Sequence, residues 1–143
     1  MKVLLDTNVI LDFFLAREPH HEPAKKIFEL TYKEKIAAYA TASSVTDIYY
    51  IMAKRLGDDE ARGVIRNLLS LLAIISVDGE DCAGALDLPI QDYEDAVIST
   101  CAAKEDMDFV LTNDIGFLQA DQNIICVVIP SDFLNDVAAY GIL

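Results

Sequence analysis

The chain has 143 residues, of which 53% are hydrophobic and 24% are charged. That length corresponds to one domain, so we expect residues 1–143 to fold as a single unit, and the composition excludes a disordered, collagen-like or low-complexity protein. Because 24 acidic groups outweigh 11 basic ones, the formal net charge is −13, which excludes attraction to nucleic acids or anionic membranes through overall charge alone.

A repeated change of hydrophobic period predicts alternating strands and helices. The first half predicts a strand over Lys2–Asp6, helices over Val9–Phe14 and His21–Lys35, a strand over Ile36–Ala42, a helix over Ser43–Leu56, and a helix from Asp58 that buries Val64, Ile65, Leu68, Leu69 and Leu72. The second half predicts a strand over Ile74–Val77, helices over Glu80–Leu88 and from Asp92 to Asp106, strands over Phe109–Thr112 and Ile124–Ile129, and a last helix from Pro130.

Short apolar strands separated by helices indicate a parallel sheet that helices cover on both faces. Because the crossovers between parallel strands are right-handed, the sequence predicts a three-layer α/β/α fold, Rossmann-like, with a central five-stranded sheet. All strands of such a sheet end at the same edge. Ligands bind at that edge, at the point where the strand order reverses.

Four aspartates fall at or near this predicted edge. Asp6 ends the first strand, and Asp114 directly follows the fourth. Asp47 lies in the first turn of the helix after the second strand, and Asp95 lies in the first turn of the helix before the fourth strand. If the strand order reverses between the first and fourth strands, Asp6 and Asp114 face each other across the crevice.

Carboxylates gathered in this way would repel one another strongly if bare. Oxygen ligands with no nearby His or Cys suit Mg²⁺ or Mn²⁺, and the number of candidate ligands is compatible with one or two ions. Such a site can activate water and hold a phosphodiester. The structural alternative is helix capping, because Ser44-x-x-Asp47 and Asp92-x-x-Asp95 fit the capping-box spacing, and Asp6 or Thr7 could cap the helix that follows.

The segment Leu4–Asp12 is similar to the opening of a PIN-domain nuclease. Asp92–Val97 and Val110–Phe117 resemble the third and fourth acidic motifs of that family, and Ser43–Asp47 lies where the second is expected. This resemblance spans nearly the whole chain. It implies a compact α/β/α domain that cleaves single-stranded or structured RNA with Mg²⁺ or Mn²⁺.

The resemblance also implies roles for individual residues. The metal-binding and catalytic set of the family matches Asp6, Asp47, Asp95 and Asp114, and the supporting polar residues match Thr7, Asn8, Thr112 and Asn113. The second acidic residue of the family is usually Glu, so the shorter Asp47 has less reach toward a metal ion. Asp92 competes with Asp95 for the third place, and we favour Asp95 because Ala96 and Val97 follow it as in the family pattern.

Small members of this family are often VapC-type toxins, which implies a partner antitoxin and a homodimer. Any contact with RNA should come from the first half of the chain, because residues 67–143 carry one basic group against fourteen acidic ones. Lys25, Lys26, Lys54 and Arg55 are candidates for such a contact, although a solvated helix surface explains them equally well.

Two other functional classes fit an acidic edge of a parallel sheet. One is a phosphoryl-transfer domain, either a receiver or a haloacid-dehalogenase-like phosphatase. No Lys follows residue 104, which counts against a receiver, and Asn8 occupies the place of the second phosphatase Asp. The other is a catalytically degenerate binding module.

Three cysteines lie far apart without a C-x-x-C pair, which predicts neither a zinc site nor a disulfide framework. We therefore expect a reduced, cytoplasmic chain. We expect no association with a membrane, since no apolar run reaches the roughly 18 residues of a membrane helix.

Overall fold

A five-stranded parallel sheet forms the centre of the computed structural model, which describes residues 1–120 and 123–143. The strand order is β3-β2-β1-β4-β5, and each neighbouring pair is parallel. The strands are β1 (Lys2–Leu5), β2 (Ala37–Thr41), β3 (Ala73–Ile75), β4 (Phe109–Leu111) and β5 (Cys126–Val128). This arrangement confirms the predicted α/β fold.

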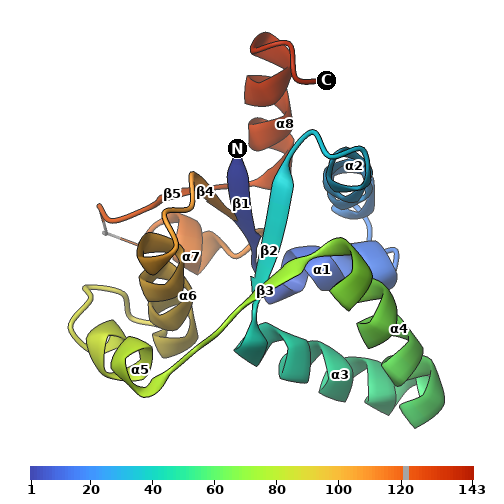
Figure 1. Cartoon of the computed structure of the whole chain (residues 1–143), viewed down its shortest axis with the longest axis horizontal. Helices are drawn as coiled ribbons and strands as arrows, with labels where there is room; N and C mark the ends of the chain where they lie inside the picture. Colours follow the sequence, from blue (N-terminus) through green and yellow to red (C-terminus); the bar gives the residue numbers. More distant parts are fainter. Residues whose placement is uncertain (121–122) are drawn as a thin grey trace.

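Helices cover both faces of the sheet (Figure 1). They are α1 (Thr7–Phe14), α2 (His21–Tyr32), α3 (Ala42–Leu56), α4 (Asp58–Leu71), α5 (Gly79–Ala85), α6 (Tyr93–Lys104), α7 (Ile115–Leu118) and α8 (Pro130–Ala139). Each of the two faces buries its own hydrophobic cluster.

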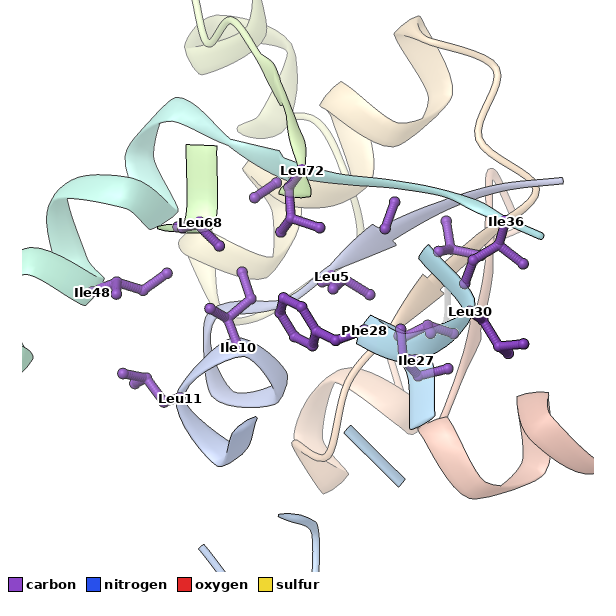
Figure 2. Packing of buried hydrophobic residues seen from close by; sticks show 14 of the residues in the cluster. Leu5, Ile10, Leu11, Ile27, Phe28, Leu30, Ile36, Ile48, Leu68 and Leu72 are labelled. Atoms are coloured by element: carbon purple, nitrogen blue, oxygen red, sulfur yellow. The ribbon is translucent and has the colours of Figure 1, made fainter. Parts of the chain in front are cut away.

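Alternation along the central strand divides the core between these two clusters. Val3 and Leu5 of β1 pack into the cluster formed with α1 to α4 and α8, whereas Leu4 packs into the cluster formed with α5, α6 and α7. Figure 2 shows Leu5 in the first cluster, close to Phe28 of α2 and Ile10 of α1. Successive side chains of a strand point to opposite faces, so β1 anchors both layers of helices.

The strand order reverses between β1 and β4, as the sequence analysis required. β1 pairs with β2 on one side and with β4 on the other. The backbone N–H of Asp6 donates to the carbonyl of Leu111 at 2.9 Å, which continues the pairing past the last residue of β1. The residues that follow β1 and β4 therefore start side by side at the carboxyl edge of the sheet.

The start of α3 differs from the prediction. Thr41 is the N-cap, and its Oγ1 accepts a hydrogen bond from the backbone N–H of Ser44 at 3.2 Å. Because α3 begins at Ala42, Asp47 lies in the second helical turn, and the predicted capping box of Ser44 and Asp47 is wrong. Thr41, at the end of β2, caps α3 through its side-chain hydroxyl. The sequence pattern did not show whether Thr41 or Ser44 would be the N-cap residue.

Two further differences concern burial and a short helix. Leu69 was expected to be buried but is 52% exposed, whereas Leu68 is fully buried. The apolar stripe of α4 is therefore narrower than its sequence indicates. Helix α7 was not predicted, because four residues are too few for a helical period to be visible. The other predicted elements are confirmed, with shifted ends.

Within the two described ranges, no helix combines the length and the apolar character that crossing a membrane requires.

The position of Leu4 leads to a stability prediction. Leu4 is fully buried, and Leu86 is 73% exposed. Leu4→Ala should lower the free energy of unfolding by roughly 2–5 kcal/mol, because it leaves a cavity beneath α6, whereas Leu86→Ala should change it little. Urea unfolding of both variants checks this, and equal unfolding midpoints would contradict the described packing.

Candidate active site

Asp6 lies at the carboxyl edge of the sheet, where burial and hydrogen bonds fix its side chain. It is 5% exposed and is the N-cap of α1. Its Oδ1 accepts a hydrogen bond from the backbone N–H of Thr7 at 2.8 Å. Its Oδ2 accepts hydrogen bonds from Thr112 Oγ1 at 2.7 Å and Asn8 Nδ2 at 2.9 Å. Burial raises the pKa of this carboxyl, and these donors oppose the rise.

Polar side chains tie the loop after β1 to the loop after β4. Asn8 Oδ1 accepts from the backbone N–H of Asn113 at 3.1 Å, and Thr112 Oγ1 accepts from the backbone N–H of Asp114 at 3.0 Å. Thr7 Oγ1 donates to Ser44 Oγ of α3 at 2.9 Å. These contacts connect each residue predicted to support the site with a neighbouring segment and fix the direction of the Asp6 carboxylate.

The four predicted aspartates line one cavity of about 450 Å³. Its lining residues are Asp6, Thr7, Asn8, Leu11, Arg17, Asp47, Tyr50, Ile51, Asp92, Glu94, Asp95 and Asp114. We call this space the carboxylate cavity. The fold therefore brings together residues that are separated by up to about a hundred positions in the sequence.

Three of the carboxylates in this cavity cap helices. Asp6 caps α1, Asp92 caps α6 by accepting from the backbone N–H of Asp95 at 3.2 Å, and Asp114 caps α7 by accepting from the backbone N–H of Gly116 at 2.9 Å. The positive ends of three helices therefore face the same region, and each stabilises a nearby negative charge. The capping predicted for Asp6 is confirmed, and Asp92 caps α6. The predicted capping box with Asp95 is not formed, because no hydrogen bond among the described residues returns from the Asp95 side chain to the backbone of Asp92. A functional role for these residues is compatible with capping.

Asp95 has no such compensation. It is 6% exposed, and within residues 1–120 and 123–143 no group donates a hydrogen bond to its carboxylate. The pKa of Asp95 is raised to about 7, first by burial and then by the negative charges of Asp92, Asp6 and Asp114. A cation in the cavity would relieve this cost, because it would replace the missing donors and offset the repulsion.

Glu94 is an acidic residue of the cavity that the sequence analysis missed. Its pKa is also raised to about 7, first by burial and then by its hydrogen bond and charge repulsion with Asp47. The contact joins α3 to α6. The signal in the sequence was an additional acidic residue in the first turn of a helix that starts at the ligand-binding edge.

Arg17 is the only Lys or Arg among the residues described as lining this cavity. The four basic residues predicted to contact RNA, Lys25, Lys26, Lys54 and Arg55, line neither this cavity nor the two that adjoin it. One adjoining cavity, of about 620 Å³, shares Asp92, Asp95 and Asp114, and another, of about 390 Å³, shares Asn8, Arg17 and Asp114.

The donor set of the carboxylate cavity fits a hard divalent cation. Its ionisable ligands are carboxylates, with no His or Cys among the residues that line it. Among the described residues, no group of three His, Cys, Asp or Glu side chains is already gathered closely enough to enclose a metal ion. The carboxylate lining itself suits Mg²⁺ better than Zn²⁺, because Mg²⁺ prefers oxygen ligands whereas structural Zn²⁺ sites use Cys and His.

A protein family model and a curated protein match the sequence of this chain. The family model of the PIN domain matches residues 2–116. A curated protein of Aquifex aeolicus (strain VF5), Ribonuclease VapC1, is 26% identical over 129 residues, which cover 87% of this chain and 89% of that protein.

Solved structures show the same fold at lower identity. VapBC2 from Rickettsia felis, bound to a DNA fragment from its promoter, superposes with a TM-score of 0.68 and 19% identity, over 89% of this chain and 98% of that one. Mycobacterium tuberculosis VapC20, described as a sarcin-ricin loop cleaving toxin, gives 0.67 and 14%, over 85% and 96%.

The raised pKa of Asp95 predicts how stability depends on pH. The folded chain holds this proton up to pH about 7, whereas an unfolded Asp releases it near pH 4. The folded state thus binds more protons between these values, and the free energy of unfolding falls as the pH rises through them. Asp95→Asn removes the group and should stabilise the metal-free chain by roughly 1–3 kcal/mol at about pH 8, with little effect near pH 4.

Urea unfolding in EDTA across this pH range checks the prediction. Asp136→Asn is the matched control, because Asp136 is exposed on α8 and lies outside the carboxylate cavity. A gain in stability that is equal for the two variants, or independent of pH, would contradict the described environment of Asp95.

Proposed function

The chain belongs to the PIN domain family, and from this premise we propose that it is an endoribonuclease that hydrolyses RNA phosphodiesters with Mg²⁺ or Mn²⁺. The observation that carries the proposal is the carboxylate cavity, where Asp6, Asp47, Asp95 and Asp114 converge at the reversal point of a parallel sheet. Such reversal points are where α/β sheets bind their ligands.

Asp6 and Asp95 are the residues that would hold the metal ion. Asp6 is rigid, because three donors fix its carboxylate. Asp95 has the opposite property: among the described residues no donor reaches its carboxylate, and its pKa is raised to about 7. Asp114 and Asp47 complete the set from two other sides, Asp114 from the start of α7 and Asp47 from the second turn of α3.

A bound Mg²⁺ or Mn²⁺ would supply a water of lowered pKa and positive charge for the leaving oxygen. The protein residues provide the orientation that this chemistry needs. Thr7, Asn8 and Thr112 hold Asp6, and Asn113 holds Asn8 through its backbone N–H. Glu94, with a pKa of about 7, can hold or release a proton at its carboxyl group near neutral pH.

Asp47 acts through Glu94 in this proposal. Asp47 is one methylene shorter than the Glu usual at this position of the family, and the carboxyl group of Glu94 is its hydrogen-bond partner. The contact with Asp47 helps to raise the pKa of Glu94 to about 7, because two carboxylates in contact repel each other when both are ionised. We assign Asp47 an indirect contact with the metal ion.

The relatives support an RNA substrate and a protein partner. The curated relative is a ribonuclease, VapC20 is described as a sarcin-ricin loop cleaving toxin, and a structure from Klebsiella pneumoniae with the same fold is described as a toxin–antitoxin complex. We propose that this chain is likewise the toxin of such a pair, that residues 1–143 form its single nuclease domain, and that it acts in the cytoplasm as a homodimer controlled by an antitoxin.

The main test of this function is the loss of RNA cleavage. Asp6→Asn and Asp95→Asn should each reduce the cleavage rate by roughly 10²-fold or more, because each removes a charge that the transition state needs. Asp136→Asn should cleave at the rate of the unaltered chain. Gel analysis of a labelled RNA in Mg²⁺ or Mn²⁺ measures the rates, and cleavage that persists unchanged in excess EDTA would contradict the proposal.

Metal binding can be measured independently of cleavage. Titration calorimetry with Mn²⁺ should show binding that Asp6→Asn abolishes, together with proton release below pH about 7, since Asp95 and Glu94 are protonated there before binding. Proton release appears as a dependence of the heat on the ionisation enthalpy of the buffer. A chain that takes up no Mn²⁺ at any site dependent on Asp6 would instead be a degenerate binding module.

A further inference from the structure

We propose that the guanidinium of Arg17 binds a phosphate of the RNA strand beside the carboxylate cavity, and that Asp12 is the positioning residue that holds Arg17 there. This inference rests on the proposed function and extends it to the way a strongly acidic site accepts an anionic substrate. Neither residue belonged to the set predicted from the sequence.

The backbone holds Arg17 in place between α1 and α2. Its N–H donates to the carbonyl of Asp12 at 3.1 Å, and its carbonyl accepts from the N–H of His20 at 3.1 Å. Ala16, just before it, has a φ of 50°, in the left-handed region that non-glycine residues rarely adopt. The chain therefore turns sharply after α1 and returns Arg17 toward the start of that helix.

Two hydrogen bonds fix the guanidinium itself. Nε donates to Asp12 Oδ1 at 2.8 Å, and Nη2 donates to the carbonyl of Asn8 at 3.1 Å. The other oxygen of Asp12, Oδ2, accepts from Asn113 Nδ2 at 2.8 Å. Asp12 thus connects Arg17 to the residue next to Asp114. Because the Asp12 side chain is only 5% exposed, it is a rigid support.

Much of the hydrogen-bonding capacity of Arg17 is unused. A guanidinium has five N–H groups, and within the described part of the chain two of them have partners. The side chain of Arg17 is 37% exposed and lines both the carboxylate cavity and the adjoining cavity of about 390 Å³. An arginine held on one side, with free donors on the other, suits the planar geometry of a phosphate.

Charge explains why such a contact is needed. Six carboxyl side chains line the carboxylate cavity, in a chain of net charge −13. A phosphodiester that approaches them is repelled, apart from the attraction of bound cations. Arg17 provides a fixed positive charge at the wall of this cavity, whereas Lys25, Lys26, Lys54 and Arg55 do not line it.

The cavities share lining residues. Asp114 lines all three, Arg17 lines the carboxylate cavity and the cavity of about 390 Å³, and Gln91 and Gln119 line the cavity of about 620 Å³. A strand bound at the carboxylates would therefore bring one of its phosphates within reach of Arg17.

The competing explanation is that Arg17 only neutralises the buried charge of Asp12, and two variants separate these roles. Arg17→Gln removes the cation and leaves Asp12 without its ion pair, so it should lower both stability and RNA affinity. Adding Asp12→Asn to Arg17→Gln removes the uncompensated charge of Asp12. The double variant should therefore regain stability but not RNA affinity. Arg66→Gln is the matched control, because Arg66 is exposed on α4 and lines none of the three cavities.

All variants are made in the Asp6→Asn chain, so that the probe, a mixed-sequence single-stranded oligoribonucleotide, stays intact. Fluorescence anisotropy in EDTA over a range of salt gives the affinities, because the Asp6→Asn chain is expected to bind no Mn²⁺ in the cavity, and thermal unfolding gives the stabilities. We expect Arg17→Gln, with or without Asp12→Asn, to weaken binding roughly tenfold or more. The slope of log affinity against log salt should fall by roughly 0.7, the value for one lost phosphate contact.

Two results would overturn the inference. One is an affinity that recovers together with stability when Asp12→Asn is added, and the other is an effect of Arg17→Gln no larger than that of Arg66→Gln. Cleavage by the unaltered chain is measured separately. If cleavage depends on metal but RNA binding does not depend on Arg17, this inference is wrong and the proposed function stands. If RNA binding depends on Arg17 but the chain cleaves no RNA, the proposed function is wrong and the RNA contact of Arg17 stands.

Discussion

The repulsion among carboxylates crowded at one edge of the sheet is the constraint on which the rest of the site depends. The fold opposes it by directing three helix N-termini toward the cavity and by giving Asp6 three hydrogen-bond donors. These groups compensate the repulsion only in part, since the pKa values of Asp95 and Glu94 both rise to about 7. A bound cation would offset the remaining repulsion, so the electrostatic cost in the free chain would contribute to the metal affinity that we propose.

This requirement for charge compensation explains the polar network behind the cavity. Thr112 and Asn8 both donate to Asp6, and Asn113 donates to Asp12, which in turn holds Arg17. The loops after β1 and β4 thus fix the position of the acidic residues that we propose bind metal. They also fix the position of Arg17, which we propose binds RNA. Such placement on the ends of rigid strands preserves a geometry that a free loop would not.

The sequence was sufficient to predict the parallel sheet and the positions of Asp6 and Asp114 at its carboxyl edge, because strand periodicity and the reversal of strand order determine both. It predicted Asp47 at the same edge but in the wrong helical turn, because α3 is capped by Thr41. The position of Asp95 was less certain from the sequence, because its helix does not directly follow a strand. Glu94 was missed because its role arises from a contact with Asp47 of α3, which is distant in sequence. Arg17 was missed because its contacts with α1 depend on the sharp turn at Ala16. Local pattern cannot show such contacts.

A crystal structure of the chain soaked with Mn²⁺, with anomalous scattering recorded, tests the central claim most directly. Our account predicts an anomalous peak in the carboxylate cavity, within coordination distance of oxygens from both Asp6 and Asp95, and loss of that peak in Asp6→Asn. Ordered Mn²⁺ bound elsewhere on the molecule, with the cavity filled by water alone at saturating metal, would contradict it.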